Sequence, residues 1–387
     1  MPLTSSSPFI HEIIRREGGS LSPRTELAAS IKQWAADAGF DLAGIASVQQ
    51  YPELARFPEW ISAGRAGEMK YLESRDEAGQ LRRASLNSAF PWARSVIVCA
   101  INYNSAHPYS TQVDNPDRGW ISRYAWTSED YHDSVLRRLR EVEGKLKELC
   151  VGELIETRSY VDTGPVVERV YAKYAGVGWL GKNTCLINQK IGSWLFLGVI
   201  VTSLDLAPDV PAPDRCGCCT RCIDACPTNA LIAPYQLDAN KCISYLTIEK
   251  RGSIPEEMRE GIGQQVFGCD ICQDVCPWNR KAPASENPEF QPREGLLNPA
   301  LAWLVEISDE EFREKFRGSP VKRAKRSGLR RNALIAIGNS GDKRLLTVAE
   351  SACNDSDPVV VEAAQWANKR LANCRAEPEL TSRFHPE

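Results

Sequence analysis

The chain has 387 residues and a formal net charge of −3, and it is 43% hydrophobic and 25% charged. These values are ordinary for a globular protein and exclude a collagen-like, coiled-coil or wholly disordered chain. At about 150 residues per domain, the length suggests two or three domains. No stretch reaches the ~20 apolar residues of a membrane span, and residues 1–24 hold no apolar signal-peptide core. We therefore expect a cytoplasmic protein with no membrane partner.

Helices and strands alternate in the first half of the chain. The patterns predict a helix over 25–39 and apolar strands over 40–45, 95–101 and 193–201. Between the last two strands, apolar residues recur at spacings of four and three, which is typical of an amphipathic helix. These residues are Val135, Leu139, Val142, Leu146 and Leu149. The first half is therefore predicted to be an α/β domain.

The second half changes character twice. Three prolines between 205 and 215 mark a boundary, and three more within 286–300 lead into a helical region. Apolar stripes predict helices over 329–337 and 359–371, about one two-helix repeat apart, as in a pair of HEAT-like repeats. Because a free-standing solenoid needs ~3 repeats, we expect these helices to pack on the rest of the protein.

Cysteine is the most informative residue type. Nine of the 14 cysteines lie between Cys216 and Cys276. A disulfide scaffold would be small and secreted, so this density indicates metal ligands. The remaining five are scattered: Cys99, Cys150, Cys185, Cys353 and Cys374.

Two cysteine runs have the spacing of iron–sulfur ligands. The first is Cys216-x2-Cys219-x2-Cys222-x3-Cys226-Pro227, the bacterial ferredoxin pattern, in which the fourth cysteine binds the other cluster. The second, Cys269-x2-Cys272-x3-Cys276-Pro277, is one cysteine shorter, and Cys242 upstream would supply the missing ligand. The predicted sets are Cys216, Cys219, Cys222 and Cys276 for cluster one, and Cys226, Cys242, Cys269 and Cys272 for cluster two.

Cys218 interrupts the first run and would crowd its neighbours, so we expect it not to be a ligand. The alternative for both runs is a pair of structural zinc sites, which also use Cys-x2-Cys. Zinc rarely needs the crossed Cys-x3-Cys-Pro arrangement twice, which favours two [4Fe–4S] clusters. Two adjacent clusters conduct single electrons, which implies an external single-electron reductant.

Several further segments resemble the epoxyqueuosine reductase family, whose members depend on cobalamin and complete queuosine in tRNA. The resemblance extends roughly from Thr25 to Leu371 and departs at the N-terminal extension, at 87–89 and at Cys218. Besides the cysteine runs, the matching segments are 123–126, 130–133, Asp162-Thr163-Gly164-Pro165, Gly178-Trp179-Leu180-Gly181-Lys182-Asn183-Thr184, 241–246 and 330–334.

The resemblance implies reduction of an epoxide on the wobble nucleoside to an alkene, with two electrons and two protons entering and water leaving. It implies cobalamin and two [4Fe–4S] clusters as cofactors, and tRNA with a queuosine-type anticodon as the partner of a monomer. The implied fold is an α/β cobalamin-binding domain, a bacterial ferredoxin-like domain and C-terminal α-helical HEAT-like repeats. The expected boundaries are 1–24 (extension), 25–210 (α/β), 211–285 (ferredoxin-like), 286–375 (helical, tRNA-binding) and 376–387 (tail).

Asp162 has two interpretations from the residues alone. Aspartate favours helix caps and proline favours the first helical position, so Asp162 to Pro165 could be a helix-start turn. The resemblance instead implies that Asp162 gives a proton to the leaving epoxide oxygen, which requires a raised pKa and a partly desolvated site. No Asp-x-His-x-x-Gly motif occurs, so no imidazole is expected to replace the cobalamin base, and His132 is expected to be structural.

The resemblance also implies contacts to a base-off cobalamin lying over the α/β domain. Arg83 and Ser122 would bind its amides or nucleotide tail, and the main chain near Leu186 and Leu197 would line the ring beside Asp162. Ser244 and the pair Cys269-Asp270 would bridge cofactor and cluster two. The alternative for each residue is ordinary packing or solvation.

Residues 317–331 hold seven basic residues and no acidic one. Because like charges repel unless something neutralises them, we favour phosphate contacts over a solvated helix start. Lys250 and Arg251 extend the same charge toward the second cluster. The residues predicted to bind tRNA are Lys250, Arg251, Lys322, Arg323, Lys325 and Arg326.

Two other functions are compatible with parts of the sequence. A reductive dehalogenase-like enzyme also pairs cobalamin with two clusters, but it would need a small closed apolar pocket and no phosphate-binding surface. A non-enzymatic iron–sulfur electron carrier would not explain the presence of Asp162 or of the large α/β domain. The basic stretch and the C-terminal helices favour tRNA.

Overall fold

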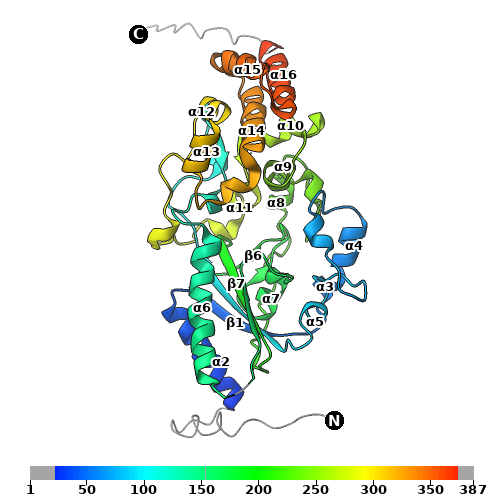
Figure 1. Ribbon diagram of the computed structural model, residues 1–387, viewed down its shortest axis with the longest axis vertical. Coiled ribbons are helices and arrows are strands. Elements are labelled where there is room, and N and C mark those ends of the chain that lie inside the picture. Colours follow the sequence, from blue (N-terminus) through cyan, green and yellow to red (C-terminus); the bar gives the residue numbers. More distant parts are fainter. Residues whose placement is uncertain (1–21, 153, 374–387) are drawn as a thin grey trace, which may run out of the picture.

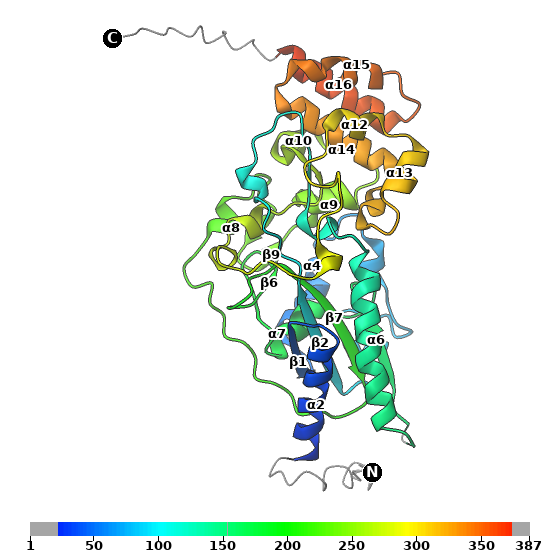
Figure 2. The ribbon, with the colours of Figure 1, turned by 90° about the vertical axis from the view of Figure 1, so that its left-hand side faces the viewer.

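The computed structural model describes residues 22–152 and 154–373. The molecule is elongated, with the α/β part at one end, the helices of 301–373 at the other and the cysteine-rich segment between them (Figures 1 and 2). The predicted extension up to residue 21, the tail and Cys374 lie outside the described residues. No helix in the described ranges combines the length and the apolar character that crossing a bilayer requires.

A four-stranded antiparallel sheet forms the centre of the N-terminal part. Its strand order is β1 (Leu42–Ser47), β2 (Ser95–Asn102), β7 (Leu195–Thr202) and β4 (Thr157–Tyr160). Every residue of β2 is buried, because helices cover both faces of the sheet, and its sequence is therefore a continuous apolar run. The three predicted strands are confirmed, with ends shifted by at most two residues.

Helices pack on both faces of this sheet. The helices α2 (Pro23–Asp37) and α6 (Tyr131–Leu149) cover one face, and α3 (Pro52–Ala55), α5 (Leu86–Ala89) and α7 (Glu168–Tyr174) cover the other (Figure 1). Both helices predicted here, over 25–39 and along the apolar stripe, are confirmed. The first four stripe residues are fully buried, whereas Leu149 in the last turn is only partly buried.

The cysteine-rich segment is built from short elements. They are α8 (Arg221–Asp224), β8 (Leu231–Ala233), β9 (Gln236–Leu237), α9 (Ile243–Ile248), α10 (Glu256–Ile262), β10 (Gln265–Phe267) and α11 (Ile271–Asp274). Strand β10 pairs in parallel with β3 (Trp120–Ile121) from the connection between β2 and α6. Gly268 then turns with φ +72°, and a Cβ there would lie 2.5 Å from Ser122, so only glycine fits before Cys269.

The C-terminal helices share their core with this segment. They are α12 (Leu301–Glu306), α13 (Asp309–Lys315), α14 (Lys325–Ser340), α15 (Leu346–Ala352) and α16 (Pro358–Asn373), and α14 packs against α16. The two predicted helices are confirmed within α14 and α16. One apolar core runs from Trp120 and Phe267 through Leu246 to Leu334 and Leu371. The helices therefore pack on the rest of the protein, as the low repeat number indicated.

Buried polar groups of α14 fix it to the cysteine-rich segment. Arg331 is 1% exposed and donates hydrogen bonds to the carbonyls of Leu246 (2.8 Å), Lys250 (2.9 Å) and Gly252 (2.6 Å). Arg330 is 7% exposed and pairs with Asp355 at 2.6 Å. Both guanidinium groups are therefore used inside the fold, so the expected phosphate contacts of the stretch 317–331 cannot include these two arginines.

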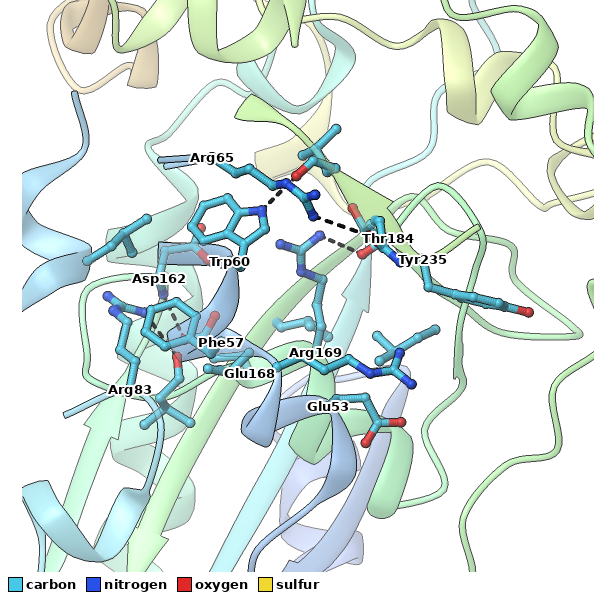
Figure 3. A pocket seen from close by; sticks show the side chains of 18 of the residues that line it. Glu53, Phe57, Trp60, Arg65, Arg83, Asp162, Glu168, Arg169, Thr184 and Tyr235 are labelled. Carbon is cyan, nitrogen blue, oxygen red and sulfur yellow. Dashed lines mark hydrogen bonds between the residues drawn. The ribbon is translucent and has the colours of Figure 1, made fainter. Parts of the chain in front are cut away.

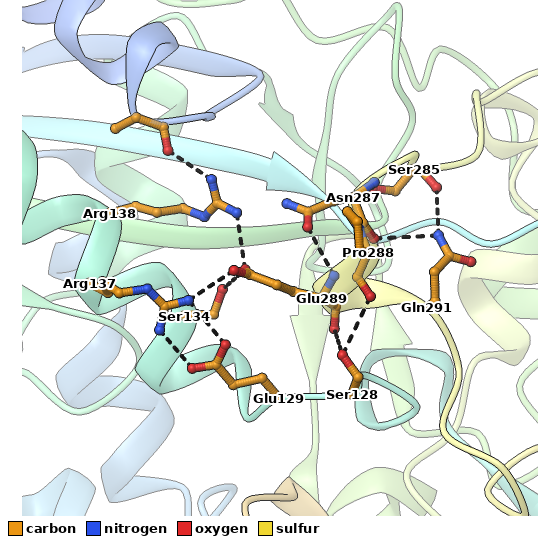
Figure 4. A network of polar contacts seen from close by, with 11 residues as sticks. Ser128, Glu129, Ser134, Arg137, Arg138, Ser285, Asn287, Pro288, Glu289 and Gln291 are labelled. Carbon is orange, nitrogen blue, oxygen red and sulfur yellow. Dashed lines mark hydrogen bonds and ion pairs between the residues drawn. The ribbon is translucent and has the colours of Figure 1, made fainter.

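A polar network fixes residues 285–291 against α6 (Figure 4). The Glu289 carboxylate accepts from Arg137 (2.9 Å), Arg138 (3.0 Å) and the Ser134 hydroxyl. Arg138 also donates to the Ala38 carbonyl at 2.8 Å, which ties the end of α2 to the same point. The segment that leaves the cysteine-rich part is thus attached to the helical face of the sheet.

Candidate active site

A cavity of about 970 Å³ lies beside the sheet, within the usual size range of cofactor and ligand pockets (Figure 3). The first residues of β7, Leu195 to Leu197, contribute an apolar wall. The segment of α3 and α4 (Phe57–Ser62) contributes Phe57 and Trp60, and charged side chains project from the remaining walls. Further lining comes from the turn before α7, from the loop that holds Gly181 and Thr184, and from β9.

Asp162 lines this cavity from the turn between β4 and α7. Its φ of +57° is a left-handed conformation that few non-glycine residues adopt. The Tyr131 hydroxyl donates to Oδ2, and the backbone N–H of Asp162 donates to Oε1 of Glu168 at 2.9 Å. Helix α7 begins only at Glu168, with Val167 as its N-cap, so the helix-start interpretation of Asp162 is wrong. Asp162 is exposed, so the desolvation expected at this residue is absent.

Backbone strain is concentrated at the cavity. Within the described ranges, six non-glycine residues have a positive φ, and three of them line this cavity. They are Asp162 (+57°), Thr184 (+65°) and Tyr235 (+65°). Such conformations persist only where the surrounding structure imposes them, and they cluster at functional sites. This clustering indicates that the cavity is the working site of the molecule.

Glu168 is a candidate that the sequence did not reveal. Its side chain lines the cavity although the residue is only 8% exposed. Burial, and then the negative charge of Asp162, raise the pKa of Glu168 well above its ordinary value, while Arg83 acts in the opposite direction. In the sequence it resembles an ordinary acidic residue in the first turn of a helix, and only the tertiary packing shows its burial.

The residues predicted to contact cobalamin are not all at the cavity. Arg83 and Leu197 line it, and Arg83 Nη1 donates to the Val166 carbonyl at 3.2 Å. Ser122 donates to Asp270, which also accepts from Trp120 Nε1 at 3.0 Å and from the backbone N–H of Arg123 at 2.8 Å. Five of the predicted residues do not line the cavity: Ser122, Asp270, Leu186, Ser244 and Cys269. Their contacts with the cofactor stay a prediction.

The cysteines predicted for cluster one lie together. Burial, followed by repulsion from Cys216 and Cys222, raises the pKa of Cys276 to about 11. Burial also raises the pKa of Cys222, which has Cys216 and Cys219 as charged neighbours. The structure thus brings four thiols together at the position predicted for this cluster, and thiols are the donors that iron–sulfur clusters use.

The second set is grouped in the same way. Burial raises the pKa of Cys269, whose neighbours are Cys242 and Cys226. The pKa of Cys272 is raised by a hydrogen bond to Cys185 and by burial, and also by the nearby charges of Cys269 and Cys242. Cys218 is exposed and is not among these neighbours. No three His, Cys, Asp or Glu side chains of the described residues converge as they would around one metal ion. Ligands of a cubane bind separate iron corners, so they are spread more widely than the ligands of a single ion.

One loop connects the cavity to both cysteine groups. Gly181 and Thr184 line the cavity, while Lys182 Nζ donates to the Gly217 and Cys219 carbonyls at 2.7 and 3.0 Å. Asn183 donates to the Cys272 carbonyl at 3.2 Å. Cys185, which the sequence analysis left among the scattered thiols, forms a hydrogen bond with Cys272 that lowers the pKa of Cys185. The cysteine groups are therefore adjacent to the cavity wall.

The cations predicted to bind tRNA differ in their environments. Lys250 pairs with Glu68, and Arg323 pairs with Glu249 at 2.9 Å while its guanidinium lies 5.5 Å from the centre of the Tyr71 ring. Arg326 is partly buried and donates to the Ile307 carbonyl at 2.7 Å. The side chains left exposed are those of Arg251, Lys322 and Lys325, together with that of Arg323.

This basic surface approaches the cavity. Arg251 Nη1 donates to the Arg323 carbonyl at 2.7 Å, so two segments far apart in the sequence meet here. Burial raises the pKa of Tyr71, and the charges that act on it include those of Arg323, Arg83 and Asp162. The Tyr71 ring thus contacts Arg323 of the basic surface and is near enough to Arg83 and Asp162 of the cavity for their charges to act on it.

Two family models match the chain. One, described as a 4Fe-4S double cluster binding domain, covers residues 215–279, and the other, described as Epoxyqueuosine reductase QueG, DUF1730, covers residues 83–163. The first includes all eight predicted cluster ligands and Cys218. The second contains Ser122 and three residues that line the cavity, Arg83, Tyr131 and Asp162.

Curated relatives match nearly the whole chain. The epoxyqueuosine reductase of Xanthomonas campestris pv. campestris is 38% identical over 89% of this chain and 96% of its own length. The epoxyqueuosine reductase of Pseudomonas aeruginosa is 39% identical over 91% of this chain and 97% of its own length. That of Escherichia coli is 36% identical, with 88% and 89% covered.

Solved structures give the same result. A crystal structure of an epoxyqueuosine reductase with an epoxyqueuosine-modified tRNA-Tyr stem loop has a TM-score of 0.79 and 32% identity, and 89% of this chain and 90% of that chain are covered. The structure of the enzyme from Streptococcus thermophilus has a TM-score of 0.79 and 27% identity, with 92% of each chain covered.

Proposed function

Because the chain belongs to the epoxyqueuosine reductase family, we propose that it reduces epoxyqueuosine to queuosine at the wobble position of tRNA, the last step of queuosine biosynthesis. The observation that carries this assignment to specific residues is the strained, exposed Asp162 in a cavity whose wall also contacts both cysteine groups. A relative was solved with a modified tRNA stem loop, which supports tRNA as the substrate.

The eight grouped thiols would hold two [4Fe–4S] clusters in the crossed arrangement. The double-cluster family match and the thiol groups support this ligand scheme. Because Lys182 and Asn183 connect the cluster loops to the cavity wall, an electron that enters from an external reductant would have a short path to the cavity.

Cobalamin is the cofactor that we propose for the cavity. The apolar wall at Leu195 to Leu197 suits a corrin face, and Arg83 and backbone groups at the rim suit its amide side chains. When bound, cobalamin supplies a strongly reducing cobalt centre for the two-electron step. The choice of this cofactor rests on the family resemblance and on this fit of apolar wall and polar rim.

The residues of the chain would handle the proton and the substrate. Asp162 would deliver a proton to the epoxide oxygen, and Tyr131 would orient the carboxyl by its hydrogen bond to Oδ2. The exposed cations at 251 and 322–325 would bind phosphates of the anticodon arm beside the cavity.

The test is a direct product assay. Protein reconstituted with iron, sulfide and cobalamin is given a low-potential reductant and tRNA that contains epoxyqueuosine, and the digested nucleosides are analysed by mass spectrometry. We expect the epoxyqueuosine peak to be replaced by queuosine, which is lighter by one oxygen. Fully loaded protein that leaves the epoxide intact would refute the assignment. Reductive removal of halogen from an aryl halide, with no action on tRNA, would favour the dehalogenase-like alternative.

A further inference from the structure

We propose that Glu168 is a positioning residue that shares one proton with Asp162 and passes it to the Asp162 carboxylate, from which it goes to the substrate oxygen. This inference rests on the proposed function for its catalytic part. In the transfer, the O–H bond of the Glu168 carboxyl breaks and an O–H bond to the Asp162 carboxylate forms, without any change in oxidation state. Solvent protons restore Glu168 between turnovers.

The geometry places the Glu168 carboxyl against the Asp162 turn. Oε1 of Glu168 accepts the backbone N–H of Asp162 at 2.9 Å, and a hydrogen bond between the two side chains is among the causes that raise the pKa of Glu168. Oδ2 of Asp162 is occupied by the Tyr131 hydroxyl. Asp162 therefore has a phenol on one side and the Glu168 carboxyl on the other. Asp162 and Glu168 lie on the same side of the cavity (Figure 3).

Burial distinguishes the two acids. Asp162 is exposed at the cavity, whereas Glu168 is 8% exposed, and among the described residues no cation forms an ion pair with it. The charged or titratable groups that face Glu168 are Asp162 from the turn, Arg83 from the segment before α5, and Tyr131 from α6. Ionising both adjacent carboxyls has a high free-energy cost, because their negative charges repel and only one partly buried cation lies nearby. The pair therefore retains a proton.

The raised pKa of Glu168 agrees with this geometry. Burial is the largest cause and the charge of Asp162 the next. Asp162 is exposed at the cavity, so the desolvation that favours a neutral carboxyl acts on Glu168. A buried neutral neighbour supplies the desolvated acid that the sequence analysis expected at Asp162 itself.

The first experiment compares pH profiles of single-turnover reduction in the wild type and in Glu168→Gln. The amide keeps an oxygen to accept the Asp162 N–H, but it has no proton to share and would stabilise the ionised Asp162. We expect the alkaline limb of the profile to move down by at least one pH unit, with a rate loss of tenfold or more above neutral pH. A purely structural role predicts an equal loss at every pH and no shift of the limb, which would overturn the inference.

The second experiment does not depend on activity. The carbonyl stretch of a protonated carboxyl is measured by infrared difference titration of cofactor-free protein. We expect a band that persists above neutral pH in the wild type and is missing in Glu168→Gln. Glu143→Gln is the control, because Glu143 is ionised against Lys147, Thr157 and Ser159 away from the cavity. A wild type without the band would refute the shared proton, whether or not the protein reduces epoxyqueuosine. An inactive wild type that retains the band would refute only the proposed function.

Discussion

The Tyr131 hydroxyl donates to the Asp162 carboxylate and thereby connects helix α6, on one face of the sheet, with a strained turn at the cavity. The Tyr131 ring is fixed independently, because it stacks on Phe196 with centroids 4.3 Å apart and planes 2° apart. Removing the hydroxyl should therefore leave the ring in place and release only the carboxylate.

Tyr131→Phe is the corresponding variant. A hydrogen bond to a charged group contributes about 1.5–3 kcal/mol, so we expect single-turnover reduction to slow by about ten- to a hundredfold. Cluster content and tRNA affinity should be unchanged. Tyr171→Phe is the matched control, because the buried Tyr171 hydroxyl has no hydrogen-bond partner among the described residues and its removal should be neutral. Equal rates for wild type and Tyr131→Phe would show that Asp162 is oriented by other groups.

Asp162→Asn tests the proton donor itself. Asparagine tolerates the left-handed backbone at this position, so the turn should be retained. Reduction should slow by about 10²–10⁴-fold, the usual loss on removing a general acid, while cobalamin, clusters and tRNA still bind. The assay is single-turnover conversion by fully loaded protein. A rate close to that of the wild type would mean that another group protonates the epoxide oxygen.

The cluster ligands are tested by metal analysis. Cys218 is exposed and belongs to neither thiol group, so Cys218→Ser should retain about eight irons per chain, as two four-iron clusters require. Cys242→Ser removes a partly buried member of the second group and should lose or degrade that cluster. Iron content and the electron paramagnetic resonance spectrum of the reduced protein measure both effects. An intact second cluster without Cys242 would contradict the crossed scheme.

The basic surface is tested by the salt dependence of tRNA binding. Replacing the exposed Lys322 and Lys325 with glutamine should reduce the slope of log affinity against log salt by roughly one per lost phosphate contact. Arg140→Gln with Lys145→Gln is the control, because these exposed cations lie on α6, across the sheet from the cavity. If both double variants keep the wild-type slope, this surface is merely solvated.

The sequence predicts those features whose pattern lies within one short segment, and it misses those that depend on contacts between distant segments. The cysteine sets could be proposed because seven of the eight ligands lie within two short runs of fixed spacing. The buried strands could be predicted because both of their faces are apolar. Strand β4 was missed, because its Thr-Arg-Ser-Tyr sequence at the sheet edge is polar and half exposed. Glu168 was missed because its burial depends on helices and turns that meet only in the folded chain.

Arg331 shows the same limit for charge. A run of basic residues indicates a surface, yet the partners of this guanidinium are carbonyls about eighty residues earlier in the chain. Arg331→Met should remove those donors and leave buried carbonyls unpaired, which costs roughly 1–3 kcal/mol each where no water replaces the arginine. We expect a clear loss of unfolding free energy in a denaturant titration of the cluster-loaded protein. Lys325→Met, at an exposed position of the same helix, should change stability by less than about 0.5 kcal/mol. Equal stability of the two variants would mean that the hydrogen bonds of Arg331 do not hold α14 against the cysteine-rich segment.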